Sequence, residues 1–369
     1  MDTNRLTDVD SSFLAYLRSL AIFVIVFGHV GGFWAFRPYS EFLHVFISMF
    51  FFISGAVSYY SFRRLPHVRS YYAKRIVGLL VPYYLLCILS LLVYCIINHK
   101  FPCLDIGNVL RWIQIRPSNA IMPFPVGQVW FLHTFFFVII ASPVYFVLAE
   151  KNNVFLPLII VIIIVISYTQ LQYDLAKSLY FFGNNLYKPL VFSGFFVFGV
   201  IAFTSTRLRD SRFVVFLLFL SLALNAVIVV LFSLNIDLSF HVFSPDIYYV
   251  LISYSSILIA FLLKQKLVWF VQKNKVVEYS FMFFHKHTFS IFILHTFSIY
   301  LTETIGGLVD PQVKSVTYGL VKLLVVLIVT CILAVPCTAI SNKLSTFVMK
   351  VISACSIKKL RSAKGTGRS

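Results

Sequence analysis

About ten apolar runs, each long enough to cross a bilayer, dominate this sequence. A membrane-spanning helix needs roughly 20 apolar residues, and a soluble core could not bury so many segments of that kind. Of the 369 residues, 60% are hydrophobic and only 12% are charged, and the mean hydropathy is +0.90. The runs lie near residues 13–34, 42–62, 76–98, 129–149, 154–172, 189–205, 213–234, 247–264, 288–305 and 316–340. The sequence therefore predicts an all-α integral membrane protein, a bundle of about ten transmembrane helices.

The basic residues indicate how the chain is oriented. Cytoplasmic loops carry an excess of Lys and Arg, and most of the 31 basic residues fall in inner segments if the N-terminus is inside. We therefore expect both termini to be cytoplasmic, with a transmembrane domain over residues 1–345 and a basic tail over residues 346–369. The net charge of +18 follows from this topology and from attraction to anionic lipid. We expect the lipid bilayer as a partner and no nucleic acid. The six cysteines lack the paired spacing of a metal site, so we expect no metal.

The first run, "LRSLAIFVIVFGHV", contains two polar residues, Arg18 and His29, that are costly at membrane depth. Eleven residues separate them, which is about 16 Å along a helix. Eleven steps of about 100° also bring both side chains to one helix face, with His29 beyond mid-membrane. A structural interpretation makes Arg18 an interfacial anchor and His29 a histidine satisfied by a neighbouring helix. The functional interpretation makes this face part of a reaction path.

A basic stretch precedes the third run and is expected on the cytoplasmic side. Its candidate anion-binding residues are Arg64, Arg69, Lys74 and Arg75. Topology alone could explain these cations. Alternatively they form a cradle for a phosphorylated donor, because the planar fork of arginine matches phosphate geometry.

Four further residues are candidates for a tunnel or an acceptor side. Ser54 and the neighbouring Gly55 are small residues suited to close helix packing in the second run. Trp130 and His133 lie at the outer end of the fourth run, where an interfacial tryptophan is common. His295 lies near the middle of the ninth run.

Five stretches together resemble the membrane acyltransferase 3 family. They are "LRSLAIFVIVFGHV", "MFFFISGAV", "AKRIVGLLVPYY", "VWFLHTFFF" and "SIFILHTF", in the order that this family has them. The resemblance implies transfer of an acyl group, usually acetyl, from cytoplasmic acyl-CoA to a hydroxyl of a cell-envelope glycan. A bacterial surface polysaccharide such as O-antigen, capsule or exopolysaccharide, modified at the cytoplasmic membrane, is the default acceptor. Acetyl-CoA is then the donor substrate, no cofactor is bound, and a glycan or lipid-linked glycan is the acceptor.

The resemblance also assigns roles to individual residues. His29 matches the catalytic histidine and Arg18 its companion, and Arg75 matches the first arginine of a pair that opens the third helix. The chain departs from the pattern at Gly78, where the second arginine would stand. If the second arginine of the family binds the phosphate of the donor, then Arg69, Lys74 or Arg64 must replace it in this chain.

The residues leave the mechanism open between two routes. Histidine can act as a general base for the incoming hydroxyl near neutral pH, or it can accept the acyl group itself and relay it outward. Glu303 is the only carboxylate within the runs, with Glu41 and Asp310 in flanking loops. Hydroxyl or amide partners such as Ser54, Tyr59 or Gln128 are further alternatives.

A multi-pass exporter of a glycan or small acid is the competing function, although such transporters usually carry more acidic residues at membrane depth. A non-catalytic scaffold for envelope assembly is a third interpretation.

Overall fold

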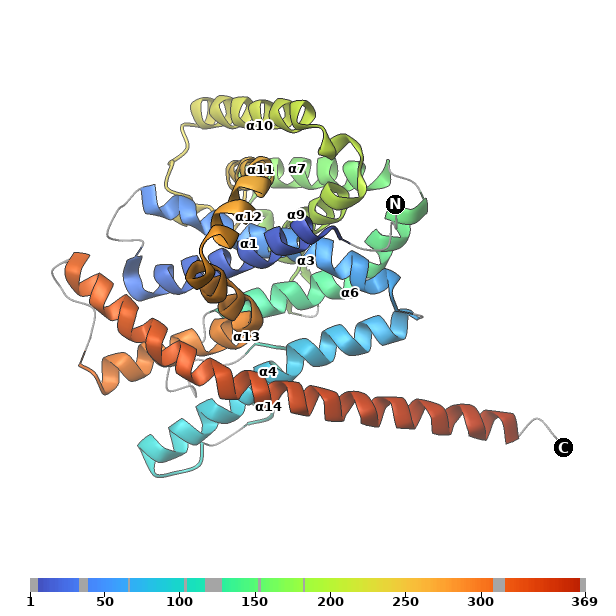
Figure 1. The fold of residues 1–369 in the computed structure, drawn as a ribbon, viewed down its shortest axis with the longest axis vertical. Coiled ribbons are helices and arrows are strands. Elements are labelled where there is room, and N and C mark those ends of the chain that lie inside the picture. The colour runs from blue at the N-terminus through green and yellow to red at the C-terminus, as the bar shows by residue number, and fades with distance from the viewer. Residues whose placement is uncertain are drawn as a thin grey trace.

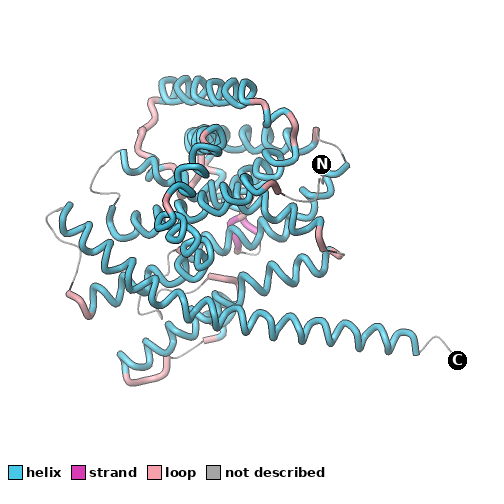
Figure 2. The backbone as a smooth tube through the Cα atoms, in the orientation of Figure 1, coloured by secondary structure: helices cyan, strands magenta, loops and turns pink. Residues whose placement is uncertain are grey.

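The computed structural model of the chain is almost entirely helical (Figure 2). It describes residues 6–32, 39–65, 67–102, 105–116, 128–151, 154–181, 183–307 and 316–365. The described strands are the two-residue pair β1 (Tyr180–Phe181) and β2 (Asn184–Asn185), which is antiparallel. The all-α membrane fold predicted from the sequence is confirmed.

Long helices coincide with the ten apolar runs. In the first half of the chain these are α1 (Asp8–Phe27), α3 (Val45–Arg63), α4 (Val68–Asn98), α6 (Val129–Lys151) and α7 (Phe155–Tyr173). In the second half they are α9 (Tyr187–Thr204), α10 (Ser211–Phe232), α11 (Ile247–Leu262), α13 (Lys275–Thr304) and α14 (Val316–Gly365). Shorter elements connect them: η1 (Gly28–Gly32), η2 (Tyr39–His44), α5 (Ile106–Ile113), α8 (Leu175–Ser178), η3 (Arg207–Arg209), η4 (Leu238–Phe240) and α12 (Lys264–Lys273).

By length and composition, eight helical segments of the described residues could cross a membrane. Counting α11 and α12, which are bent by 58° at a short break, as one span gives nine. The helix α13, which holds the ninth predicted run, does not meet this criterion. Its histidines, serines and threonines lower its hydropathy, although residues from Ser290 to Ser298 are buried among other helices. Polar side chains on a buried helix face the bundle rather than lipid.

Short polar side chains fix where several helices begin. The Thr7 hydroxyl accepts a hydrogen bond from the Asp10 amide at the start of α1. Asp246 accepts one from the Tyr249 amide at the start of α11, and Asn274 accepts from the first turn of α13. Each cap satisfies an amide that the helix itself leaves unpaired.

The helices α3 and α9 form the most intimate packing in the bundle. A Cβ added to Gly55 of α3 would lie 1.9 Å from the carbonyl oxygen of Phe196, and one added to Gly199 of α9 would lie 1.9 Å from that of Phe52. Each glycine therefore lets the opposite backbone approach directly. The predicted role of Gly55 in close packing is confirmed.

The helix α1 packs along α13 and α3 near the centre of the bundle, while α10 lies at its edge (Figure 1). The C-terminal part of α14 extends well beyond the other helices (Figure 1). The predicted boundary between residues 345 and 346 falls within this helix, and the division into domain and tail stays a prediction.

Candidate functional site

His29 lies on a distorted turn rather than on the regular helix that the sequence suggested. The α-helical part of α1 ends at Phe27, and Gly28–Gly32 form a π turn in which Gly31 has φ +96°. Glycine is the residue that adopts positive φ at little cost. The eleven-residue spacing therefore includes a non-α segment, and the remainder of the first run, residues 33–34, lies outside the described part. Such π turns occur frequently at functional sites.

The imidazole of His29 opens into a cavity of about 170 Å³ between the helices. Trp130 and His44 line the same cavity, together with side chains of α1, α6 and α13. The full lining is Val24, Ile25, Gly28, His29, Leu43, His44, Ile47, Gln128, Trp130, Phe131, Phe243 and Phe292. This mostly apolar cavity with a few polar groups has the composition of a small-molecule site.

His295 lies directly beside His29. The ring centroids are 5.0 Å apart and the ring planes are tilted by 49°. His295 is fully buried, and its Nδ1 is 2.6 Å from the carbonyl oxygen of Phe292. A carbonyl only accepts, so Nδ1 donates this bond, and in the neutral ring Nε2 carries the lone pair. Within the described residues, Nε2 of His295 has no hydrogen-bond partner.

A histidine–carboxylate pair, His44 and Glu41, stands at the same cavity. Nδ1 of His44 is 3.1 Å from Oε2 of Glu41, whose side chain is only 1% exposed. His44 is close enough to His29 for the two to interact electrostatically. The sequence placed Glu41 in a flanking loop without linking it to a histidine. A histidine three residues later, at the start of the second apolar run, was the available signal, because i and i+3 residues meet in a helical turn.

Glu303, the carboxylate within the predicted runs, has a different partner. Its Oε1 accepts a hydrogen bond of 2.8 Å from Nζ of Lys322 on α14, and Lys322 is 2% exposed. Glu303 therefore serves to compensate a buried cation between α13 and α14.

Gln128 contributes an amide to the cavity wall. Its Nε2 donates to the Thr296 hydroxyl at 2.5 Å, while its Oε1 is buried with no partner in the described part of the chain. A buried acceptor left unpaired is costly and suits a ligand that donates to it.

A second group of polar residues lies toward the other end of α1. Arg18 interacts electrostatically with Arg75 of α4 and with His285 of α13. The Arg75 guanidinium lies 5.8 Å from the centroid of the Tyr71 ring and donates from Nη2 to the Val57 carbonyl at 3.4 Å. Arg75 also interacts electrostatically with Arg64.

Unpaired polar atoms gather at this basic group. Nε of Arg75, Oγ of Ser58 and Nδ1 of His285 are buried without a partner among the described residues. Like charges held together with unsatisfied donors favour an anionic ligand. Arg18 and His29 thus both face α13, which presents His285 to one and His295 to the other.

The remaining predicted site residues do not line the cavity. Arg69 and Lys74 are exposed near the start of α4, and Arg64 is exposed with Nε donating to the Tyr60 carbonyl at 3.2 Å. Ser54 is partly buried in α3 and is not among the cavity lining. His133 bonds to Asn184 Oδ1 at 3.0 Å, outside the cavity. At Gly78, a Cβ would meet nothing within 4 Å, so the place of the second arginine is open space.

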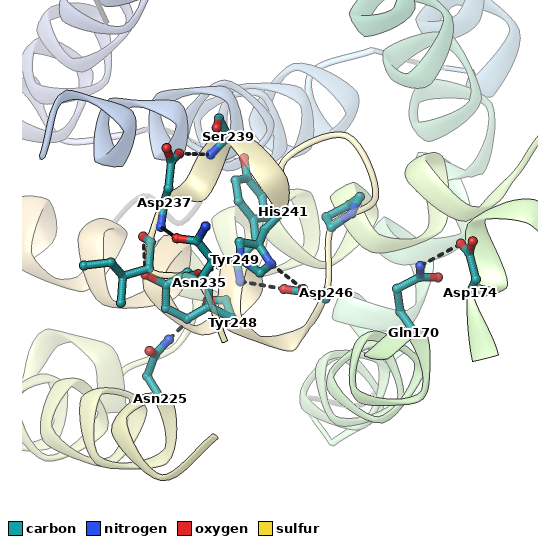
Figure 3. Close-up of polar contacts among 12 residues, drawn as sticks. Gln170, Asp174, Asn225, Asn235, Asp237, Ser239, His241, Asp246, Tyr248 and Tyr249 are labelled. Atoms are coloured by element: carbon teal, nitrogen blue, oxygen red, sulfur yellow. Dashed lines mark hydrogen bonds and ion pairs between the residues drawn. The ribbon is translucent and has the colours of Figure 1, made fainter. Parts of the chain in front are cut away.

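The loop before α11, which carries Phe243 of the cavity wall, is held by a histidine (Figure 3). Nδ1 of His241 is 2.6 Å from Asp246 Oδ2, and Nε2 is 2.8 Å from the Asn235 carbonyl oxygen. Both partners only accept, so both ring nitrogens donate and the ring is an imidazolium. Burial alone lowers the pKa of His241, but the hydrogen bond and charge of Asp246 and the Asn235 carbonyl outweigh it, and the pKa is raised.

The described residues hold no group of three or more His, Cys, Asp or Glu side chains placed to bind a metal ion. The chemistry available to this site is acid–base chemistry by imidazoles, with cations and orphaned polar groups to bind a charged ligand.

Comparison with known proteins gives one match. Residues 11–337 match the family model of acyltransferase 3, described as an acyltransferase domain. Neither the curated proteins nor the solved structures contain a match.

Proposed function

This chain belongs to the acyltransferase 3 family of membrane proteins, and from this premise we propose that it moves an acetyl group from cytoplasmic acetyl-CoA to a hydroxyl of a cell-envelope glycan. The acceptor is a bacterial surface polysaccharide or its lipid-linked precursor, and the enzyme lies in the cytoplasmic membrane. Many apolar helices and the family match support the coarser statement, a multi-pass membrane acyltransferase.

The donor binds at the Arg18 end of the bundle. Arg75 supplies a guanidinium with an unpaired Nε, and Arg18 and Arg64 add positive charge around it. The phosphates of coenzyme A suit such a group, because guanidinium–phosphate bonds are charge-assisted and directional. Arg69 and Lys74, exposed at the start of α4, extend the basic surface toward the cytoplasm.

The thioester reaches the His29 cavity by extension of the pantetheine arm along α1. From Arg18 to the end of the α-helical part at Phe27 is about 14 Å of helix, and His29 follows within the π turn. The basic group near Arg18 suits the anionic nucleotide of the donor, and the mostly apolar cavity at His29 suits its acyl group.

Transfer then proceeds directly, with His29 as general base. Its neutral imidazole takes the proton of the acceptor hydroxyl while the oxygen attacks the thioester carbonyl. The tetrahedral intermediate collapses to the ester, and the coenzyme A thiolate leaves and recovers the proton from the imidazolium. We assign the stabilisation of the negative charge on the carbonyl oxygen to the imidazolium form of His44, whose Nδ1 pairs with Glu41 and whose Nε2–H donates to that oxygen.

The observation that carries this proposal is the contact of His29, exposed to the cavity, with the fully buried His295. Inverted vesicles that expose the cytoplasmic face provide the test. Labelled acetyl-CoA added outside should place label in the glycan fraction only when the chain is present. Label that stays in coenzyme A, or glycan export that fails while acetyl transfer is intact, would favour the exporter instead.

The same vesicles separate direct transfer from an acyl-histidine relay. Direct transfer leaves no label on the protein in the absence of acceptor. A hydroxylamine-sensitive label on wild-type chain that is missing from His29→Ala would show that the histidine itself carries the acyl group.

A further inference from the structure

A lysine stands at the edge of the His29 cavity and contacts two of its aromatic walls. Nζ of Lys188, the second residue of α9, lies 4.8 Å from the ring centroid of Trp130 and 5.5 Å from that of Phe243. Both rings line the cavity. The three side chains come from α6, α9 and the loop before α11, so tertiary packing rather than local sequence brings them together.

Lys188 has no carboxylate partner among the residues that the structure describes. The described ion pairs of lysines occupy other positions: Asp174 with Lys177, Asp10 with Lys264 and Glu303 with Lys322. Contact with aromatic faces compensates only part of the cost of partly burying an ammonium group. The ammonium therefore remains available to an external anion.

Arg116 brings a second positive charge near Lys188. His133 interacts electrostatically with both Lys188 and Arg116, and Arg116 is exposed and donates to the Gly183 carbonyl at 2.8 Å. A positive field focused at the rim of a cavity attracts anionic substrates in preference to neutral ones.

Aromatic walls add a second kind of recognition. Phe243 is 57% exposed, and Trp130 is partly exposed beside it. Such rings offer flat apolar faces to the C–H face of a sugar, while a nearby ammonium group pairs with a charged substituent of the same sugar. A neutral sugar would stack on the rings of Trp130 and Phe243 but would form no ion pair with Lys188.

We propose that Trp130, Phe243 and Lys188 form a subsite for an acidic sugar of the acceptor glycan, with Lys188 pairing with its carboxylate or phosphate. This inference rests on the proposed function in taking the acceptor to be a glycan. It adds that the acceptor is anionic close to the hydroxyl that is acylated.

Binding of three sugars to the purified full-length chain in lipid nanodiscs tests the subsite without any donor. Methyl glucuronide carries a carboxylate, glucose 6-phosphate carries a phosphate, and methyl glucoside is neutral. We expect at least one anionic sugar to bind about tenfold more tightly than the glucoside, as a charge-assisted hydrogen bond allows. The anionic sugar that binds more tightly shows whether Lys188 pairs with a carboxylate or with a phosphate.

Three variants assign the preference to the lysine. Lys188→Met keeps most of the apolar stem and should remove the preference for the anionic sugar, whereas Lys188→Arg should keep it. Lys177→Met removes an exposed lysine that is already paired with Asp174 at 2.7 Å, and it should bind all three sugars as wild type does. Equal binding of the three sugars by wild type, binding of none, or a preference that survives in Lys188→Met would overturn the inference.

The outcome is distinguishable from failure of the proposed function. Because no donor is present, a chain that selects the anionic sugar but never transfers acetyl keeps the subsite and refutes the reaction. A chain that transfers acetyl equally well to neutral and anionic glycans keeps the reaction and refutes the subsite.

Discussion

The imidazoles of His29 and His295 lie with their centroids 5.0 Å apart, one facing a cavity and the other fully buried behind it. His29 lies in η1, directly after α1, and His295 lies in α13. The helices α1 and α13 pack along one another although they are far apart in sequence. His295 is oriented by its bond to the Phe292 carbonyl, so it forms a fixed wall against the ring of His29. This contact explains how a histidine on a glycine-rich turn keeps a defined orientation.

Replacement of His295 should therefore impair turnover more than substrate binding. We expect His295→Gln to lower kcat by about a hundredfold, because His29 loses the ring that orients it as a base, with little change in the donor KM. Steady-state kinetics with acetyl-CoA measure both constants. His287→Gln, on the same helix but bonded to the Thr338 hydroxyl at 2.8 Å, is the matched control. An equal loss in both variants would contradict a specific role for His295.

Arg75 should act on the donor rather than on the chemical step. Loss of a charge-assisted contact to phosphate in Arg75→Ala should raise the KM for acetyl-CoA about tenfold. Arg75→Lys should recover only part of the affinity, since an ammonium lacks the planar fork. Arg212→Ala removes an exposed arginine on α10 and serves as the control. A donor KM unchanged by Arg75→Ala would leave the basic stretch with a topological role alone.

The His241–Asp246 pair should make stability depend on pH. In the folded protein the pKa of His241 is raised above its ordinary 6.5. The pair therefore stabilises the fold fully below pH 6.5, and this stabilisation is lost as the pH rises through the raised pKa. The thermal midpoint of wild type should exceed that of His241→Gln most clearly at acidic pH, and the two should converge in alkaline buffer. Thermal unfolding in detergent across this range measures the difference. A constant difference at all pH values would mean that the pair does not titrate.

Two glycines on neighbouring helices should respond oppositely to alanine. Gly55→Ala places a methyl group 1.9 Å from a backbone oxygen of α9 and should cost about 1–3 kcal/mol, as overpacking does. Gly78→Ala meets open space and should be neutral or stabilise α4 by up to about 1 kcal/mol. Thermal midpoints in detergent compare the two variants. Tolerance of alanine at Gly55 would disprove the close crossing of α3 and α9.

The helices were largely predictable because the thickness of a bilayer requires about 20 mostly apolar residues in each span, and a few polar residues do not obscure a run of that length. Each of the ten apolar runs contains a long helix, and the polar α13 differs only in failing a hydropathy criterion. The histidines and hydroxyls of α13 are tolerated because neighbouring helices bury them. The sequence alone does not show which helices pack against α13.

The site was predicted in part, for a similar reason. His29 and Arg18 could be singled out because charge and imidazole are rare at membrane depth. Trp130 was a candidate as an interfacial aromatic, and Arg75 came from the basic stretch and the resemblance to the family. The His44–Glu41 pair and the partners of His295 and Lys188 depend on packing between distant segments, which no local pattern encodes. The π turn under His29 was missed because extrapolating an α-helical period across glycines assumes that they continue the helix.

Acetyl transfer by His29→Ala tests the central claim most directly. His29 faces the cavity rather than the packed core, so the variant should fold and retain the wild-type thermal midpoint. With labelled acetyl-CoA supplied to inverted vesicles, its rate of label transfer to glycan should fall by at least about a hundredfold, the usual contribution of a general base. Transfer at the wild-type rate by a normally folded His29→Ala chain would contradict the account.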